Sequence, residues 1–354
     1  MKNENSINVL MLRPIIDCYG VTKVTLNLSR QLQQYGCKIY YGCQNPNDVE
    51  IIKKHNIQFI EIPFQLEKKT FSSYAKSIYV INKIVKEKKI NLIHSHHRWS
   101  SFISFFICSI YGIPLLTTYH GIHSKKRKLS IFGDAVISVS EDSKNHLISY
   151  FKIDKDKIRV IYNGINLPQQ CADITNKCNI LSVARLSKEK DHKTLFIAFK
   201  KLKQKYPKLR LTLAGDGELK NELINFSKKL DIYDNIKFLG KIENIEDIYQ
   251  KGGIFVLSST TEGFPIALLE AMSYGLPVVT TNVGGINKIV QNNINGYIVE
   301  KENPEEIYIA VSKLIDNENC STMFRENGIN TINQNFSIDK MAQDTIKLYK
   351  EILC

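Results

Sequence analysis

Two successive series of short, apolar segments rich in β-branched residues constrain the fold of this chain more than any other feature. Longer stretches with an amphipathic helical pattern separate the segments. Such alternation of strands and helices is typical of parallel sheets covered by helices, so each series predicts one doubly wound α/β domain. The strand candidates are INVLML (7–12), KIYYGC (38–43), IQFIEI (57–62), NLIHS (91–95), IPLLTTY (113–119), AVISVS (135–140) and IRVIY (158–162), then ILSVA (180–184), LRLTLAG (209–215), IKFLG (236–240), IFVLS (254–258), PVVTT (277–281) and GYIVE (296–300).

A stretch with little pattern, residues 166–179, separates the two series and contains Pro168. We interpret it as a linker, because a chain of 354 residues usually divides into two domains. The predicted domains are residues 1–167 and residues 168–336. Ligands of open parallel sheets bind beyond the carboxyl ends of the strands, so we expect the two domains to face a cleft there.

The segment WSSFISFFICSIYGIPLLTTY (99–119) has no charged residue over a length that could span a bilayer. Serines, Gly112 and Pro114 interrupt it, so we predict a short helix followed by a buried strand instead. The eight cysteines form no CxxC pair, which disfavours zinc and is typical of a reducing compartment. The first residues, MKNENSINVL, lack the apolar stretch of a signal peptide, and together these features predict a cytoplasmic protein.

The positive charge is concentrated in the first half of the chain. The net charge is +13, and residues 1–165 hold 24 Lys and Arg against 12 Asp and Glu. Such a basic field favours a polyanion, which could be a phospholipid surface, a lipid-linked diphosphate or a nucleic acid. A genome that uses lysine freely would explain it equally well. The densest cluster, KKRK (125–128), is either part of this field or a solvated loop.

No GxGxxG motif follows the first strand candidate, which disfavours a nicotinamide-dependent enzyme. Gly20 alone lies where a loop meets a predicted helix. One glycine there could let backbone N–H groups approach a phosphate, although an isolated glycine more often makes only a turn.

Arg185 and Lys190 lie in SVARLSKEKD (182–191), directly after a predicted buried strand. A planar guanidinium and a flexible ammonium suit a diphosphate. The alternative is that both are ordinary surface charges.

Two glutamates flank a Phe-Pro turn in STTEGFPIALLEAMSYGLPVV (259–279). Pro265 suits a first helical turn and Gly275 suits a helix stop, so we predict a helix over about 265–274. Glu270 then lies about 8 Å along the helix axis from its start, which would let Glu262 meet a sugar and Glu270 a ribose. The amides of Gly263 and Phe264 would point to the same place. The alternative is that Glu270 is buried and paired for structural reasons.

Histidines follow two strand candidates of the first series. His120 ends TTYHG (117–121), where it is a candidate polar contact or proton acceptor. His94, His96 and His97 in IHSHH (93–97) lack cysteine or acidic ligands nearby, so we predict no metal site.

Over residues 155–300 the chain resembles the family 4 ("group 1") glycosyltransferases of the GT-B fold. The motifs occur in the family's order, and the most specific is the E-x7-E pattern from Glu262 to Glu270. The other motifs are VIYNGIN (160–166), SVARLSKEKD, LAGDGEL (213–219), FLGKIENIEDIY (238–249), GGINKIV (284–290) and NGYIV (295–299). The last helix of such proteins returns to the N-terminal domain, and residues 337–354 resemble it.

The resemblance implies transfer of a sugar from a nucleoside diphosphate sugar, here a UDP-sugar, with retention of anomeric configuration and without metal or cofactor. It implies that Arg185 and Lys190 bind the diphosphate and that Glu262 and the Gly263–Phe264 backbone hold the sugar. It also implies that Glu270 binds the ribose, that His120 lies near the reacting carbon and that Gly20 approaches the phosphates. The predicted catalytic residues are His120, Glu262, Arg185 and Lys190; the predicted donor-binding residues are Gly20, Arg185, Lys190, Glu262, Gly263, Phe264, Pro265 and Glu270.

The resemblance and the basic first half together predict a growing glycan acceptor in bacterial surface polysaccharide synthesis: capsule, O-antigen or lipid-linked oligosaccharide. They also predict peripheral attachment to the anionic cytoplasmic face of the inner membrane, and no nucleic-acid partner. The loop CYGVTKV (18–24) departs from the family, which often has two glycines and then an acidic–Arg pair, so Gly20 alone of this loop is carried over as a donor contact. Alternatives are a non-catalytic nucleotide-binding relative, a nucleotide-sugar epimerase and, less in keeping with the motifs, a glycosidase or a nucleic-acid binder.

Overall fold

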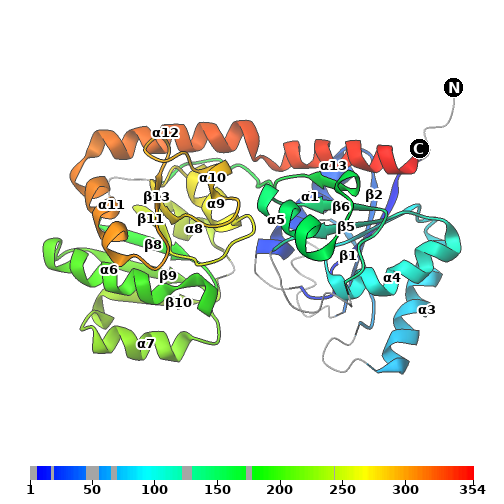
Figure 1. Cartoon of the computed structure of the whole chain (residues 1–354), viewed down its shortest axis with the longest axis horizontal. Coiled ribbons are helices and arrows are strands. Elements are labelled where there is room, and N and C mark those ends of the chain that lie inside the picture. Colours follow the sequence, from blue (N-terminus) through cyan, green and yellow to red (C-terminus); the bar gives the residue numbers. More distant parts are fainter. Residues whose placement is uncertain are drawn as a thin grey trace. The chain divides into compact units, whose positions relative to one another are not determined.

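The computed structural model describes residues 6–16, 20–44, 56–64, 70–121, 130–172, 178–242 and 244–354. The chain forms two compact units (Figure 1). Unit 1 comprises Met1–Gly164 and Ile338–Cys354, and unit 2 comprises Ile165–Ser337. The cluster at 125–128 and part of the CYGVTKV loop lie outside the described residues.

Unit 1 is built on a parallel sheet with the strand order β3-β2-β1-β4-β5-β6-β7. The order reverses between β1 and β4, as in a doubly wound sheet, so both faces can be covered by helices. Every strand candidate of the first series is confirmed. The strands are β1 (Asn8–Leu12), β2 (Lys38–Cys43), β3 (Gln58–Glu61), β4 (Leu92–Ser95), β5 (Leu115–Tyr119), β6 (Ala135–Ser138) and β7 (Ile158–Val160).

The uncharged segment 99–119 forms a helix and a strand, as predicted. Helix α4 (Arg98–Tyr111) ends at Gly112, whose φ of 61° stops it, and β5 follows. Within the described part of the chain, no helix combines the length and the apolar character needed to cross a membrane. The other helices of unit 1 are α1 (Gly20–Gln34), α3 (Phe71–Glu87), α5 (Glu141–His146), a π-helix (Leu147–Phe151), a 3₁₀ turn (Lys155–Lys157) and α13 (Ile338–Leu353).

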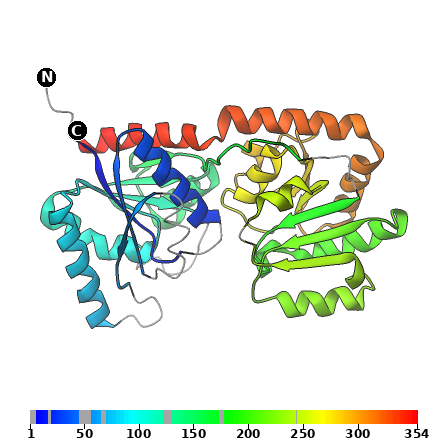
Figure 2. The ribbon, with the colours of Figure 1, turned by 180° about the vertical axis from the view of Figure 1, so that it is seen from behind.

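Helix α13, the last of the chain, packs on α1 within unit 1 (Figure 2). Gln31 Nε2 and Tyr35 Oη of α1 and its C-terminal turn donate to Asp339 Oδ1 at 3.0 and 2.7 Å. Its buried face includes Tyr349, which has no exposed surface. The helix therefore joins the unit that opens the chain.

Unit 2 has a second parallel sheet, with the strand order β10-β9-β8-β11-β12-β13. Here too the order of the strands reverses, between β8 and β11. All strand candidates of the second series are confirmed. The strands are β8 (Asn179–Val183), β9 (Arg210–Ala214), β10 (Ile236–Gly240), β11 (Ile254–Leu257), β12 (Val278–Thr281) and β13 (Tyr297–Val299). The helices are α6 (His192–Lys205), α7 (Lys220–Lys229), α8 (Glu246–Gln250), α9 (Ile266–Ser273), α10 (Ile286–Ile289), α11 (Pro304–Asp316) and α12 (Glu318–Asn335), with 3₁₀ turns at Lys188–Lys190 and Tyr233–Asn235.

The boundary between the units lies at 164/165, three residues before the predicted 167/168. Ile165 belongs to unit 2 because its N–H donates to the carbonyl of Phe336 at 3.0 Å. The predicted linker is also partly anchored. Ala172 is buried, its N–H donates to Tyr274, and its carbonyl accepts from Arg325 Nη1 at 2.8 Å. Backbone pairing, which the weak sequence pattern does not reveal, fixes this part of it to unit 2.

Candidate active site

The loops that follow β8 and β11 in unit 2 are bound to each other. These strands are neighbours in the sheet, so their carboxyl ends open at the same edge. Ser258 Oγ lies 3.0 Å from the carbonyl oxygens of both Lys190 and Asp191, and Thr260 N–H donates to the carbonyl of Glu189 at 2.8 Å. These bonds hold the predicted diphosphate-binding motif beside the loop that carries Glu262.

Lys190 and Glu262 form an ion pair at this edge. Lys190 Nζ lies 2.6 Å from Glu262 Oε1, and Ser259 Oγ donates to the same oxygen at 2.6 Å. The side chains of Glu262 and Lys190 are only 8% and 20% exposed. A carboxylate and an ammonium that are largely buried are each stabilised by the opposite charge of the other, so their relative position is closely fixed. The structure thus brings together two of the predicted catalytic residues.

Arg185 has a different partner, Glu189. Arg185 Nη2 lies 2.6 Å from Glu189 Oε1 across one turn of the loop. Although burial alone would raise the pKa of Glu189, hydrogen bonds, including that from Arg185, lower it to about 2. The prediction grouped Arg185 with Lys190 and overlooked Glu189. Its signal was present, since Arg185 and Glu189 are four residues apart inside the motif.

Two glycines explain why neighbouring motifs pack so closely on these loops. At Gly284 φ is +56°, and a Cβ would lie 2.1 Å from the carbonyl oxygen of Glu262. At Gly215 φ is +145°, and a Cβ would lie 1.9 Å from the carbonyl oxygen of Ala184. Any side chain would force the backbone apart at both points. The motifs LAGDGEL and GGINKIV therefore support the backbone that carries Arg185 and Glu262.

The three predicted donor-binding residues of the turn before α9, Gly263, Phe264 and Pro265, each make different contacts. Pro265 is the N-cap, so α9 begins one residue later than predicted. The carbonyl of Gly263 accepts from Gly285 N–H at 3.2 Å. Phe264 has a buried side chain whose ring packs on Phe336, with centroids 5.4 Å apart. Its side chain therefore serves the core, and only its backbone is a candidate for donor binding.

Glu270 lies on α9 and is 8% exposed. Tyr249 Oη, at the end of FLGKIENIEDIY, donates to Glu270 Oε2 at 2.9 Å. Burial, and then the negative charge of Glu270, raise the pKa of Tyr249 well above its usual value, which keeps the phenol a donor. Tyr274 stacks on Tyr249 with centroids 5.3 Å apart. Glu270 thus has the structural partner that the sequence left open as an alternative, and this partner also orients the carboxylate.

The histidines of unit 1 gather at the carboxyl edge of β4 and β5. His96 Nδ1 lies 2.9 Å from His120 Nε2, and the two rings stack at 5.2 Å. His94 is fully buried, with Thr118 Oγ1 and Tyr349 Oη each 2.7 Å from its ring nitrogens. Burial lowers the pKa of His94 to about 3. His97 instead caps α4 by accepting from the N–H of Trp99. Among the described residues no cluster of His, Cys, Asp and Glu could hold a metal ion.

Gly20 is the first residue of α1, directly after residues that the structure does not describe. Near it, Arg13 Nε donates to Thr22 Oγ1 at 2.8 Å, and both side chains are buried. Gly20 and His120 belong to unit 1, whereas the other predicted site residues belong to unit 2.

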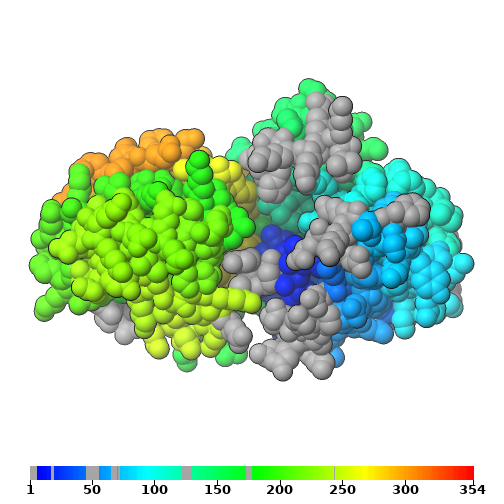
Figure 3. Space-filling view, turned by 90° about the horizontal axis from the view of Figure 1, so that it is seen from below, coloured from blue at the N-terminus to red at the C-terminus, as the bar shows by residue number. Residues whose placement is uncertain are grey.

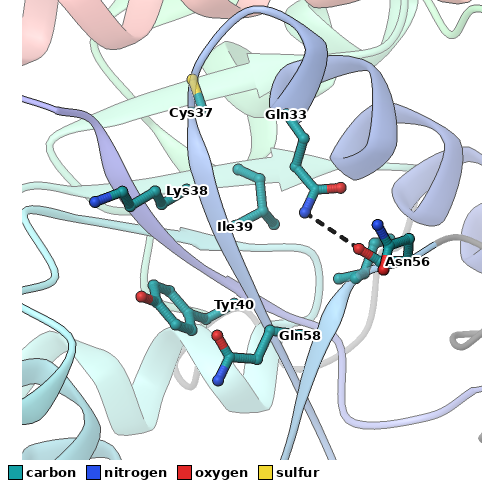
Figure 4. A pocket seen from close by; sticks show the side chains of 8 residues that line it. Gln33, Cys37, Lys38, Ile39, Tyr40, Asn56 and Gln58 are labelled. Carbon is teal, nitrogen blue, oxygen red and sulfur yellow. Dashed lines mark hydrogen bonds between the residues drawn. The ribbon is translucent and has the colours of Figure 1, made fainter.

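A pocket elsewhere in unit 1 is not part of this candidate site. It lies at the amino ends of β2 and β3, where Gln33 Nε2 donates to the carbonyl of Asn56 at 3.4 Å (Figure 4). Parallel sheets bind their ligands at the opposite, carboxyl ends.

Two family models match the chain in succession. Residues 19–169 match "Glycosyltransferase Family 4", and residues 168–331 match "Glycosyl transferases group 1". The meeting point of the two models falls within a few residues of the boundary between the units. Together they take in every predicted site residue.

Individual relatives cover nearly the whole chain. The Escherichia coli UDP-Gal:alpha-D-GlcNAc-diphosphoundecaprenol alpha-1,3-galactosyltransferase is 26% identical, with 100% of this chain and 99% of the relative covered. The Bacillus anthracis N-acetyl-alpha-D-glucosaminyl L-malate synthase is 24% identical, covering 84% and 90%. Among solved structures, Anabaena HepE in complex with UDP-glucose has a TM-score of 0.87 at 18% identity, covering 98% and 100%. That structural likeness concerns the fold.

Proposed function

Because the chain belongs to the group 1, family 4 glycosyltransferases and has their GT-B fold, we propose that it transfers a sugar from a UDP-sugar to a growing glycan with retention of anomeric configuration. The observation that carries this proposal is the Lys190–Glu262 pair, held at the carboxyl edge of β8 and β11 beside the start of α9. The choice of UDP rests on the names of relatives, namely the galactosyltransferase that uses UDP-Gal and HepE in complex with UDP-glucose.

The cations of unit 2 suit a departing diphosphate. In the proposed reaction the bond from the anomeric carbon to the phosphate oxygen breaks while a bond to the acceptor oxygen forms on the same face. The acceptor's proton moves to the departing phosphate. Negative charge grows on that phosphate in the transition state, where Lys190 and Arg185 stabilise it most. Arg185 would exchange its half-exposed partner, Glu189, for the diphosphate.

The two glutamates hold the donor at either end. We propose that Glu262, fixed by Lys190 and Ser259, accepts hydrogen bonds from sugar hydroxyls, while the backbone N–H groups of Gly263 and Phe264 donate to oxygens of the sugar. Glu270, oriented by Tyr249, would accept from the ribose hydroxyls. Since side chains supply the positive charge, no step in this scheme requires a resident metal or a cofactor.

The acceptor and the location of the protein follow from unit 1. We propose a lipid-linked glycan acceptor of bacterial surface polysaccharide synthesis, with the protein attached to the cytoplasmic face of the membrane. A support is an apolar face on α3 and α4, the helices of the light-blue and cyan part of the chain in Figure 3. In this face Phe105, Phe106 and Ile110 are 42%, 46% and 74% exposed. We call it the aromatic face; it comprises Tyr74, Trp99, Phe102, Phe105, Phe106 and Ile110.

Charge around the aromatic face favours an anionic bilayer as its partner. The ring of Tyr74 contacts those of Trp99, Phe102 and Phe106, so the rings form one layer between the helices. Aromatic rings settle at the headgroup level, and lysines extend toward lipid phosphates. Between residues 70 and 112 the acidic residue is Glu87, and the basic residues are Lys76, Lys83, Lys86, Lys88, Lys89 and Arg98.

Thermal unfolding with nucleotides tests the donor class. We would compare UDP, GDP, ADP, CDP and TDP, each with and without EDTA. A nucleotide at about 100 times its dissociation constant stabilises the folded state by about 2.7 kcal/mol. A shift with UDP alone that EDTA does not change is the expected result. A selective shift with another nucleotide would replace UDP. UDP binding without turnover of any UDP-sugar would favour a non-catalytic relative, and turnover of donor without acceptor would favour an epimerase.

A further inference from the structure

Two consecutive serines, Ser258 and Ser259, follow β11 directly and contact both members of the Lys190–Glu262 ion pair. Ser259 has no exposed surface, and Ser258 is almost completely buried. The hydroxyl of Ser259 donates to the carboxylate of Glu262, whereas that of Ser258 donates to the backbone of Lys190. The two neighbours therefore act on different parts of the pair, one on a side chain and the other on a backbone.

The two oxygens of the Glu262 carboxylate differ in their partners. Oε1 accepts from both Lys190 Nζ and Ser259 Oγ, each at 2.6 Å, so both of its lone pairs are used. None of the residues that the structure describes donates to Oε2. Oε2 is also not among the fully buried, unpartnered polar atoms of this part of the chain, so it still reaches solvent. The structure thus fills one oxygen and leaves the other for a ligand.

The sheet holds Ser259 in place. Thr281, the last residue of β12, donates from Oγ1 to the carbonyl of Ser259 at 2.5 Å, and β12 is paired with β11. The terminal torsion of a glutamate has broad minima, so the orientation of its carboxylate depends mainly on its hydrogen-bond partners. Without the hydroxyl of Ser259, Lys190 alone would remain on Oε1 of Glu262, and the carboxylate could turn.

Ser258 acts on the motif that carries Lys190. Its Oγ lies 3.0 Å from the carbonyl oxygens of Lys190 and Asp191. Asp191 has a φ of 42°, in the left-handed region that residues other than glycine rarely adopt. A hydroxyl proton shared by the two carbonyls stabilises this turn, and with it the backbone that orients Lys190.

We propose that the two serines are positioning residues with separate roles. Ser259 directs Oε2 of Glu262 to a hydroxyl of the donor sugar, and Ser258 keeps Lys190 in place for the diphosphate. The identity of both ligand groups rests on the proposed function. Because UDP lacks the sugar, loss of the Ser259 hydroxyl should weaken binding of a UDP-sugar but not of UDP, whereas loss of the Ser258 hydroxyl should weaken both.

Calorimetric titration of the full chain with UDP, UDP-galactose and UDP-glucose tests this division. Ser259→Ala should weaken binding of the UDP-sugar about 10-fold, since one hydrogen bond to the carboxylate loses its alignment, and should leave UDP binding within about 2-fold. Ser258→Ala is the matched control and should weaken both ligands about 5-fold. Equal losses of UDP and UDP-sugar affinity in Ser259→Ala, or no loss of either, would overturn the proposal.

A second variant reaches Ser259 without changing it. Thr281→Val keeps the shape of the side chain but removes its hydrogen bond to the Ser259 carbonyl. It should weaken binding of the UDP-sugar about 3-fold and leave UDP binding unchanged. A loss shared equally by both ligands would contradict the role of Ser259.

Crystal structures without ligand separate this inference from the proposed function. In Ser259→Ala the Glu262 carboxylate should rotate or adopt more than one orientation, whereas in the unsubstituted protein it should have one. A single, unrotated carboxylate in the variant would overturn the positioning role, whatever the ligand. If the carboxylate rotates but the unsubstituted protein binds neither UDP nor a UDP-sugar, the proposed function fails and the orienting role of Ser259 stands.

Discussion

The two sheets carry their polar residues at the same topological place but in opposite electrostatic states. At the edge of β8 and β11 in unit 2, the side chains are charged and paired: Lys190 with Glu262 and Arg185 with Glu189. At the edge of β4 and β5 in unit 1, buried imidazoles meet one another, and burial keeps His94 and His96 uncharged. One edge is suited to compensating the charge of a diphosphate. The other offers directed hydrogen bonds without adding charge.

The charged edge should be the more sensitive of the two to substitution. Glu262→Gln removes the carboxylate that fixes Lys190, and Arg185→Ala removes a diphosphate cation. Each should lower kcat by roughly 100-fold or more, the cost of losing one preorganised charged contact in a transition state. The measurement is the steady-state rate with the UDP-sugar that the nucleotide screen identifies. The matched control is Glu222→Gln, which breaks the exposed ion pair to Lys193 and should leave the rate unchanged. Near-normal rates in both site variants would rule out the assignment.

Acid should destabilise unit 1 more than unit 2. The pKa of His94 is about 3 and that of His192, buried in unit 2, about 4, against about 6.5 for an exposed histidine. The unfolded chain therefore binds more protons in this window, and stability present above pH 6.5 is lost as the pH falls through it. Between pH 6.5 and 5 each such histidine lowers the free energy of unfolding by about 2 kcal/mol. Unit 1 has two of them, His94 and His96.

Hydrogen exchange resolved by unit measures this difference. Core amides of the unit 1 sheet should lose more protection between pH 6.5 and 5, corrected for intrinsic exchange, than those of the unit 2 sheet. His94→Gln removes one titrating group, so the loss of protection with falling pH in unit 1 should become closer to that in unit 2. An equal loss of protection in the two units of the unsubstituted protein would mean that the histidines of unit 1 do not control its acid stability.

The two units also differ at their surfaces, because the aromatic face lies on unit 1. A triple variant with Phe105, Phe106 and Ile110 changed to serine should weaken binding to vesicles of anionic phospholipid about 10-fold, through lost apolar burial. Sedimentation with vesicles at low salt measures it. Ile309→Ser in unit 2, where the side chain is 43% exposed, is the control and should change nothing. If the unsubstituted protein stays in the supernatant, the membrane proposal is wrong.

The smallest predicted effect concerns the support of Glu270. Tyr249→Phe removes one hydrogen bond to the carboxylate but keeps the ring that stacks on Tyr274. KM for the UDP-sugar should rise about 5-fold with little change in kcat, because the ribose contact is the same in the ground and transition states. Tyr274→Phe keeps the stack and the hydrogen bond, so it should behave as unsubstituted protein. A fall in kcat with unchanged KM in Tyr249→Phe would place Glu270 nearer to the chemistry.

The sheets could be predicted because buried parallel strands are apolar along their whole length. IPLLTTY and IFVLS, for example, became β5 and β11. The ion pairs could be predicted only in part. Lys190 and Glu262 are 72 residues apart in the sequence and meet because β8 and β11 are neighbours in the sheet. Neither motif indicates this strand order. The proximity of His96 to His120 depends in the same way on β4 and β5, so the IHSHH run was judged only as a metal site.

The contact of Tyr349 with His94 has a consequence for the order in which the protein assembles on the ribosome. Helix α13 is synthesised after unit 2, yet it supplies a buried hydrogen bond and a packed face to unit 1, whose strands precede unit 2. Unit 2 is one continuous segment, so it is fully synthesised at a point when unit 1 still lacks α13. During translation, domains ordinarily complete themselves from the N-terminus onward. Here we expect the opposite order, with unit 1 finished only after α13 leaves the exit tunnel.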